Sequence, residues 1–416
     1  MFTDLVQQSI HRTSAPELSI GLTPLVVIAA LLFIAVARHT KQGGKLAKAS
    51  LNDEDDLLGL SGITPFQGSP LDQKPDWPRY WKPGTFQMTM ALRRIDINNW
   101  FKMDELYDSE HAAKVAMANA PNSEDYVDYI DGVEDEAVVE LLGIVVTYLV
   151  RRYPAMFQTD GHYVYIPHLK EKYRIRSPFD YHPLAIVGLL VMDDVYVLKK
   201  DPGDQYTLYV GAFSLVSFGS RLTKNIRRRG VFLACPSGWR LQQRLGWRLH
   251  QIHDAVPILR EKLRKSMDRF FFNLKPSSAI MRNNLFIQPT GRIFHIEPFE
   301  NKPKCTSIEQ VHIRTEQQSL TRLPRSQANV FTVRTYLVPM TDLKSEPEQL
   351  EALWDHVRNF PDSIAAYKCR HLWGDVFEEF CRDVLGKSDP YLTTTGDAEA
   401  SKERPNGATS MDKVVP

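Results

Sequence analysis

Residues 230–284 decide the fold, and they read GVFLACPSGWRLQQRLGWRLHQIHDAVPILREKLRKSMDRFFFNLKPSSAIMRNN. The apolar, β-prone run 231–234 predicts a strand, which the following Cys-Pro-Ser-Gly turn ends, so a short helix is expected to begin near Trp239. Pro257 is typical of the first turn of a second, longer helix, whose apolar positions include Leu259, Leu263, Met267 and Phe270. We therefore predict a strand, a turn, two helices and the start of another strand.

Two histidines, His250 and His253, lie three residues apart at the far end of the predicted short helix. An imidazole beside a break between helices can face a cavity and bind a metal. Histidines at helix ends also commonly hydrogen-bond to a carbonyl or to water, and no partner stands here at metal-site spacing. The pattern alone therefore favours a structural role for both.

Composition places the chain among ordinary globular enzymes. The formal net charge is +1 over 416 residues, so nothing indicates nucleic-acid binding. The cysteines show no C-x-x-C spacing, which argues against a disulfide scaffold and a structural zinc site; they are Cys235, Cys305, Cys369 and Cys381.

The N-terminal part contains an uncharged segment, residues 18–37, that is long enough to cross a bilayer as one helix. Only Arg12 among Lys and Arg precedes it, whereas four basic residues follow at 38–48, so we predict a single-pass membrane protein with a cytoplasmic C-terminal domain, in the endoplasmic reticulum for example. A signal peptide cleaved after 35–37 is the alternative. The long leading region with Asp4 and Glu17 argues against cleavage.

Composition also divides the chain into segments. A short N-terminal segment, 1–17, precedes the transmembrane anchor at 18–37, and residues 38–85 read as a linker that docks only in part on the domain. The folded domain is expected at 86–385, and the polar tail 386–416 is expected to be disordered.

Hydrophobic periodicity predicts an α+β domain. Helices are expected at 104–117, 134–153, 346–358 and 374–385, and strands at 162–166, 189–198, 206–218 and 329–340. An apolar stripe at helical spacing predicts a core face on the second helix; it comprises Val138, Leu141, Leu142, Val145, Val146 and Leu149.

Two polar groups stand out within these elements. Asp193 and Asp194 interrupt an apolar run, which fits either a solvent-facing or salt-bridged pair or a buried functional acid. Residues 314–334 read RTEQQSLTRLPRSQANVFTVR, and their alternating charge favours a surface helix with intrahelical ion pairs. Arg314, Glu316 and Arg322 are also the residue types of a buried network around an acidic pocket.

Several ordered motifs resemble those of the haem-dependent oxidative N-demethylase family, which has membrane-anchored members called the HRQ family. They are Pro236-Ser237-Gly238-Trp239, Ile252-His253-Asp254-Ala255-Val256-Pro257, Arg282-Asn283-Asn284-Leu285, and the stretch from Arg314 to Pro324 with the strand that follows. Leu285, Gln317 and Met192 depart from the family pattern, which has Trp, Arg and Gln there.

The resemblance implies a PAS-like antiparallel sheet with flanking helices, here preceded by one N-terminal transmembrane helix. It implies haem b as the cofactor, with its iron, and a monooxygenase-type reaction in which dioxygen oxidises a small methylated amine and formaldehyde is released. Electrons would come from NADPH through a separate flavin and iron–sulfur reductase, since the sequence shows no flavin, nicotinamide or iron–sulfur fingerprint of its own.

The resemblance also assigns site residues. His253 is the expected axial ligand of the iron, with His250 in reserve. The expected propionate-binding cations are Arg282, Arg314 and Arg322, and the expected catalytic carboxyl groups are Asp193, Asp194 and Glu316. The basic run 221–229 fits a solvated or lipid-facing loop first and propionate binding second.

Two other functions agree with the same residues. One is a membrane-tethered haem sensor or carrier without catalysis, for which Cys235 next to Pro236 offers a thiolate ligand. The other is a haem-free, membrane-anchored binding module. An absorption spectrum separates them, because only the haem-free module lacks a Soret band.

Overall fold

The computed structural model describes residues 57–119, 127–129, 135–200, 206–212, 247–253, 256–257, 263–292 and 299–387, all in one compact unit that spans 55–416. Among these residues, no helix has the length and apolar character needed to cross a membrane. The predicted span at 18–37, the basic run at 221–229, Cys235 and the tail from 388 lie outside the described residues.

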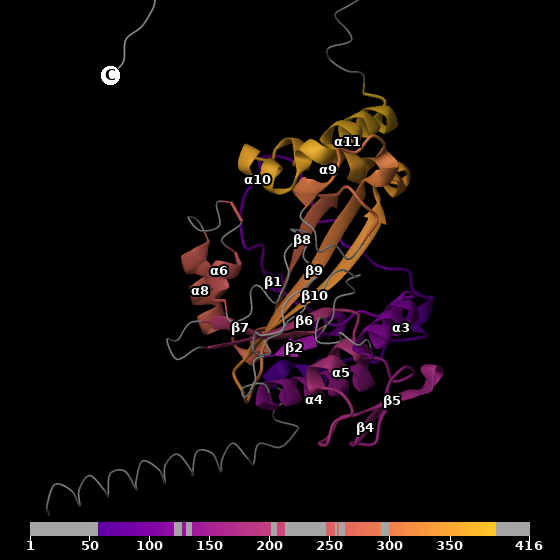
Figure 1. Cartoon of the computed structure of the whole chain (residues 1–416), viewed down its shortest axis with the longest axis vertical. Coiled ribbons are helices and arrows are strands. Elements are labelled where there is room, and N and C mark those ends of the chain that lie inside the picture. The colour runs from indigo at the N-terminus through magenta and orange to yellow at the C-terminus, as the bar shows by residue number, and fades with distance from the viewer. Residues whose placement is uncertain are drawn as a thin grey trace, which may run out of the picture. The chain divides into compact units, whose positions relative to one another are not determined.

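A seven-stranded antiparallel sheet forms the centre, in the order β1-β8-β9-β10-β6-β7-β2 (Figure 1). Its strands are β1 (Arg93–Arg94), β2 (Val127–Tyr129), β6 (Asp194–Lys200), β7 (Tyr206–Ala212), β8 (Ile280–Gln288), β9 (His312–Arg322) and β10 (Asn329–Pro339). β9 and β10 pair over their whole length, and β10 also pairs with β6, so the C-terminal strands join the earlier β6–β7 hairpin. A separate three-stranded sheet comprises β3 (Gln158–Thr159), β4 (Tyr163–Ile166) and β5 (Glu171–Arg174).

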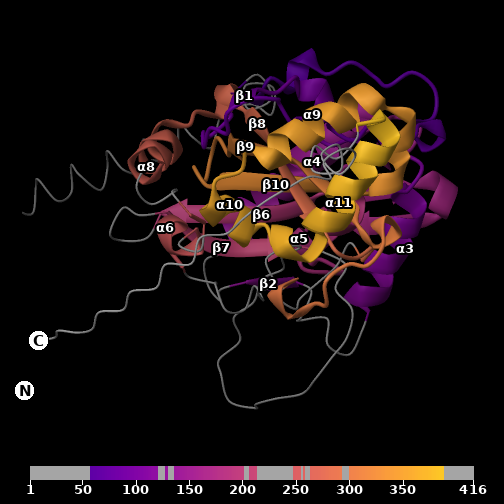
Figure 2. The ribbon, with the colours of Figure 1, turned by 90° about the horizontal axis from the view of Figure 1, so that it is seen from above.

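Helices flank the central sheet, as the α+β prediction expected. They are α3 (Tyr107–Ala118), α4 (Asp135–Arg152), α5 (Pro183–Leu190), α6 (Leu249–Ile252), α8 (Arg264–Asn273), α9 (Pro347–Arg358), α10 (Asp362–Tyr367) and α11 (Arg370–Leu385). All residues of the predicted stripe on α4 are buried, so that core face is confirmed. Both views place α6 beside α8 (Figures 1 and 2), and Figure 1 shows α9 to α11 together at one end of β8, β9 and β10.

Two hydrophobic cores hold these layers. The larger one contains α4, α5 and residues of β4 to β7, β9 and β10, and the second contains α9 to α11 with residues of β8 and β9. Trp373, which is fully buried, lies in the second core. Trp81, within the segment that was predicted as a linker, is buried and donates its Nε1–H to the Gln349 carbonyl, 2.9 Å away.

Two predicted elements were wrong. Leu189 and Leu190 end helix α5, and the strand that was expected from 189 begins only at Asp194. Every residue of α5 is buried, and a continuously apolar run does not distinguish a buried helix from a buried strand. The surface helix that alternating charge favoured at 314–322 is strand β9, and its side chains are almost all buried.

Candidate functional site

One face of the central sheet carries a row of polar side chains. The register pairs Asp194 with Val333, Val333 with Gln318 and Gln318 with Arg282, and the neighbouring row pairs Glu316 with Asn284. Paired residues, and alternate residues along a strand, point to the same side of a sheet. The structure therefore brings Asp194 to the same face as a set that we call the Glu316 cluster: Arg282, Asn284, Arg314, Glu316 and Gln318.

Glu316 is the centre of this cluster. Its Oε1 accepts from Arg314 Nε at 3.0 Å, and its Oε2 accepts from Gln318 Nε2 at 2.9 Å and from Asn284 Nδ2 at 3.2 Å. The side chains of Arg314 and Glu316 are 2% and 5% exposed. A carboxylate this deeply buried is stabilised only when hydrogen-bond donors replace the water that it has lost.

Lys368, which follows α10, brings a further cation to the cluster. Its Nζ donates to the Leu285 carbonyl at 2.5 Å and lies 4.0 Å from the centre of the Phe286 ring. Burial lowers the pKa of Lys368 to about 8, Glu316 opposes this shift and Arg282 adds to it. Sequence analysis assigned Lys368 no role.

Arg282 extends from β8 into the same cluster. Burial lowers its pKa, and Glu316 acts against that shift. Its Nε is buried and has no hydrogen-bond partner in the described part of the chain. Among the described residues, the three cations Arg282, Arg314 and Lys368 lie around the one ionised carboxylate of Glu316, and this positive charge suits an anionic ligand.

Asp194 lies beside the cluster as a neutral acid. Burial raises its pKa to about 8, while Lys114 and Arg314 act in the opposite direction. The Tyr196 hydroxyl donates to its Oδ2 at 3.4 Å. A carboxyl group with this pKa is largely protonated at pH 7 and can donate a proton or a hydrogen bond.

Asp193 belongs to the opposite face of the sheet, so the two adjacent acids do not act as one pair. Burial raises its pKa to about 7, and Arg334 and Lys114 oppose the shift. Arg334 binds Asp104 at 2.8 Å and Glu110 at 2.9 Å, in a buried ion network that sequence analysis missed. These contacts tie α3 and the segment before it to β10.

Arg322 lies further along β9 and fastens helix α8 to the sheet. Its Nη2 donates to the Phe271 carbonyl at 2.6 Å and to the Tyr206 hydroxyl, and its Nε donates to Asn329 Oδ1 at 3.1 Å. Its Nη1 donates to the Phe272 carbonyl at 3.4 Å. Most of its donors are therefore already engaged, which leaves little capacity for a propionate.

His253 directly follows α6 and is partly buried. Its Nδ1 lies 2.8 Å from the Leu249 carbonyl, which can only accept, so Nδ1 carries a proton, and in the neutral ring the lone pair then lies on Nε2. This is the tautomer that a metal-binding imidazole needs. Among the described contacts, none joins His253 to the Glu316 cluster; the backbone of His250 is in α6, and its side chain lies outside the described residues.

A haem needs an axial ligand for its iron and cations for its propionates. His253 is a residue of the first kind, and Arg282, Arg314 and Lys368 are residues of the second, so the residue types fit the group, while no described contact places His253 beside the cluster. A family model described as haem-dependent oxidative N-demethylase, alpha subunit-like, matches residues 91–378. The match covers every residue of the Glu316 cluster as well as Asp194, His253 and Lys368.

Proposed function

The chain belongs to the family of haem-dependent oxidative N-demethylase alpha subunit-like proteins, and from this premise we propose that it removes a methyl group from a small methylated amine. The methyl carbon would leave as formaldehyde. The observation that carries this proposal is the Glu316 cluster, a buried carboxylate with more cations around it than it needs, beside the neutral acid Asp194.

The protein's own residues would have distinct tasks. His253 would hold the iron of haem b through Nε2, and Arg282, Arg314 and Lys368 would bind the propionates. When bound, the haem supplies the activation of dioxygen. The apolar surroundings of α6 and α8 would exclude bulk water from it.

Asp194 and Glu316 would have different tasks. Glu316 already accepts from Arg314, Gln318 and Asn284, so it would hold the propionate-binding cations in position and would not itself bind the cationic amine. Asp194, whose pKa is about 8, can exchange a proton with the amine near physiological pH. Asp193 would act indirectly, from the opposite face.

Two further parts of the proposal concern the source of electrons and the attachment of the chain to a membrane. We propose NADPH as their source, through a separate flavin and iron–sulfur reductase, since the sequence carries no fingerprint for either group. We also propose that residues 18–37 anchor the chain in a bilayer with the family domain on the cytoplasmic side. Release of the chain from membranes by alkaline carbonate would contradict the anchor.

Haem content is the decisive test. The purified chain should show a Soret band, His253→Ala should change or abolish it, and His371→Ala, on the exposed side of α11, should leave it unchanged. Formaldehyde release with NADPH, a reductase and a methylated amine then establishes catalysis. A colourless protein after expression with ample haem would refute the proposal, and a band that depends on Cys235 would favour the carrier function.

A further inference from the structure

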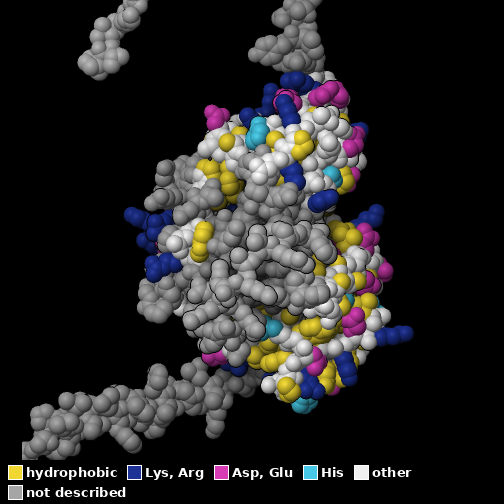
Figure 3. All heavy atoms as spheres, in the orientation of Figure 1, with side chains coloured by type: hydrophobic (Ala, Val, Ile, Leu, Met, Phe, Trp, Pro, Cys, Tyr) yellow, Lys and Arg dark blue, Asp and Glu magenta, His cyan; other side chains and the backbone are white. Residues whose placement is uncertain are grey.

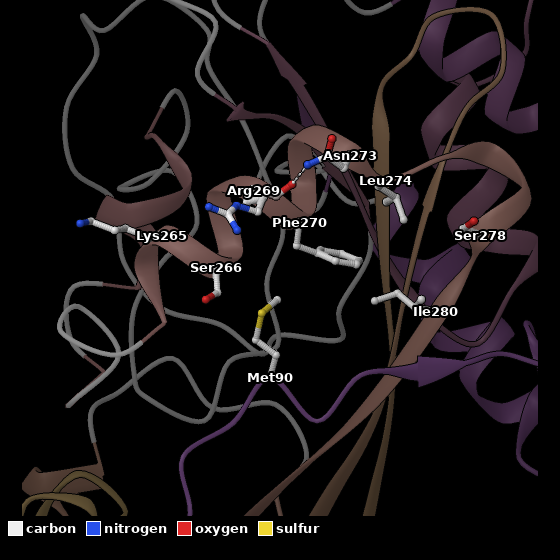
Figure 4. A pocket seen from close by; sticks show the side chains of 9 residues that line it. All are labelled: Met90, Lys265, Ser266, Arg269, Phe270, Asn273, Leu274, Ser278 and Ile280. Carbon is white, nitrogen blue, oxygen red and sulfur yellow. Dashed lines mark hydrogen bonds between the residues drawn. The ribbon is translucent and has the colours of Figure 1, made fainter.

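A cavity of about 550 Å³ lies between helix α8, the segment around Met90 and the start of β8 (Figure 4). This volume lies within the range of pockets that take small organic ligands, roughly 300–1,000 Å³. Of the described residues that line it, none was predicted to bind haem and none belongs to the Glu316 cluster. Its role is therefore a separate question.

The walls of the cavity are apolar. Met90, Phe270, Leu274 and Ile280 converge on it from three different segments, and Figure 4 shows the Phe270 ring turned toward Ile280. These side chains would bury an apolar body by the hydrophobic effect. Ser266, on α8, adds a hydroxyl to the lining.

Two cations stand on the α8 side of this cavity. Lys265 and Arg269 are four residues apart on α8, so their side chains are neighbours, and like charges at this spacing destabilise a helix. Lys265 also lies in the first turn, where a cation opposes the helix dipole and where α8 has no acidic residue. Figure 3 shows basic side chains gathered where Figure 1 places α8.

Of the charged residues on α8, Arg264, Lys265 and Arg269 are basic and only Asp268 is acidic, so the helix keeps a net positive charge. No described carboxylate forms an ion pair with Lys265 or Arg269, and both side chains are exposed. An anionic group at the mouth of the cavity would relieve the repulsion between them, whereas a protonated amine would increase it. The charge therefore selects against the proposed amine substrate at this place.

We propose that the cavity binds an amphipathic anion, a molecule of the fatty-acid class with an apolar chain and a carboxylate head. The chain would lie among Met90, Phe270 and Ile280, and the carboxylate would face Arg269 and Lys265. The proposal goes beyond the demethylase function and does not depend on it. Haem shares this chemistry through its propionates, so the experiment must separate the two ligands.

Calorimetric titration of dodecanoate into the purified full chain tests the proposal. One equivalent should bind, and dodecyltrimethylammonium, with the same chain and a cationic head, should bind at least tenfold more weakly. The double variant Lys265→Gln, Arg269→Gln should lose at least tenfold in dodecanoate affinity. Lys275→Gln is the matched control, because Lys275 is an exposed cation just after α8 that does not line the cavity, and it should bind as the wild type does.

Three results would overturn the proposal. The first is equal binding of the cationic amphipath, and the second is unchanged affinity in the double variant. The third is stoichiometric displacement of dodecanoate by haem, followed at the Soret band, which would show that the cavity belongs to the cofactor. Failure of the chain to bind haem at all would contradict the proposed function and leave dodecanoate binding intact.

Discussion

The raised pKa of Asp194 makes the stability of the fold depend on pH in a definite direction. Its carboxyl group is protonated in the folded protein up to about pH 8, because burial opposes the charged form, and its ordinary pKa is 3.8. Between these values the folded state holds one more proton than the unfolded state. The free energy of unfolding must therefore fall as pH rises through this window, and it levels off above the folded pKa.

The magnitude follows from the same two values. The pKa of Asp194 rises by about four units, and one unit corresponds to about 1.4 kcal/mol, so the whole effect is on the order of 6 kcal/mol. Asparagine has no proton to lose and resembles the neutral acid in shape. Asp194→Asn should therefore remove a slope of about 1.4 kcal/mol per pH unit from the stability curve.

Urea unfolding at pH 5, 6, 7 and 8, followed by tryptophan fluorescence, measures this slope. The free energy of unfolding of the Asn variant should rise relative to that of the wild type at each step upward in pH. Asp268→Asn is the control, because Asp268 is exposed on α8, and its curve should run parallel to that of the wild type. If Asp194→Asn keeps the wild-type slope, Asp194 is ionised in the folded protein and its assignment as a neutral acid is wrong.

Three further predictions concern single side chains. Arg334→Met should cost about 3–5 kcal/mol of unfolding free energy, since Asp104 and Glu110 lose their buried cation, and urea unfolding checks it. Trp373→Ala should cost about 3–5 kcal/mol through the cavity it leaves in the second core, seen as a lower Tm. Arg282→Gln should weaken haem binding about tenfold in a Soret titration, whereas exposed Arg176→Gln should not; equal affinities would remove Arg282 from the haem site.

Local periodicity was enough to predict the elements whose burial follows a regular spacing. The stripe on α4 and the strand at 329–340 agree with the structure to within a residue or two, because each pattern is complete within its own segment. The same reasoning failed for α5, because every residue there is apolar and the sequence therefore shows no alternation that would distinguish a helix from a strand. Strand β9 did carry a signal, since Arg314, Glu316 and Gln318 alternate with period two.

Part of the candidate site was predicted from motifs that resemble those of the family, and not from hydrophobic periodicity. The motifs named Arg282, Arg314, Glu316 and Asp194, and the sheet register brings all four to one face. Partners that lie far away in the sequence could not be found in this way. Arg334 meets Asp104 across 230 positions, and Lys368 reaches the carbonyl of Leu285 across 83. Such pairs depend on the tertiary fold and leave no local pattern.

The start of β6 connects the two faces of the sheet. Asp193 and Asp194 are adjacent, so the pleat sends one carboxyl group to the Arg334 network and the other toward the Glu316 cluster. Lys114, whose Nζ donates to the Val191 carbonyl at 2.7 Å, lowers the pKa of both acids. Burial is the largest cause of both raised pKa values, and Lys114 opposes it at Asp193 on one face and at Asp194 on the face that carries the candidate site. Replacing Lys114 by a neutral residue should therefore raise the pKa of Asp194, although Lys114 is not among the residues proposed to bind haem or the amine.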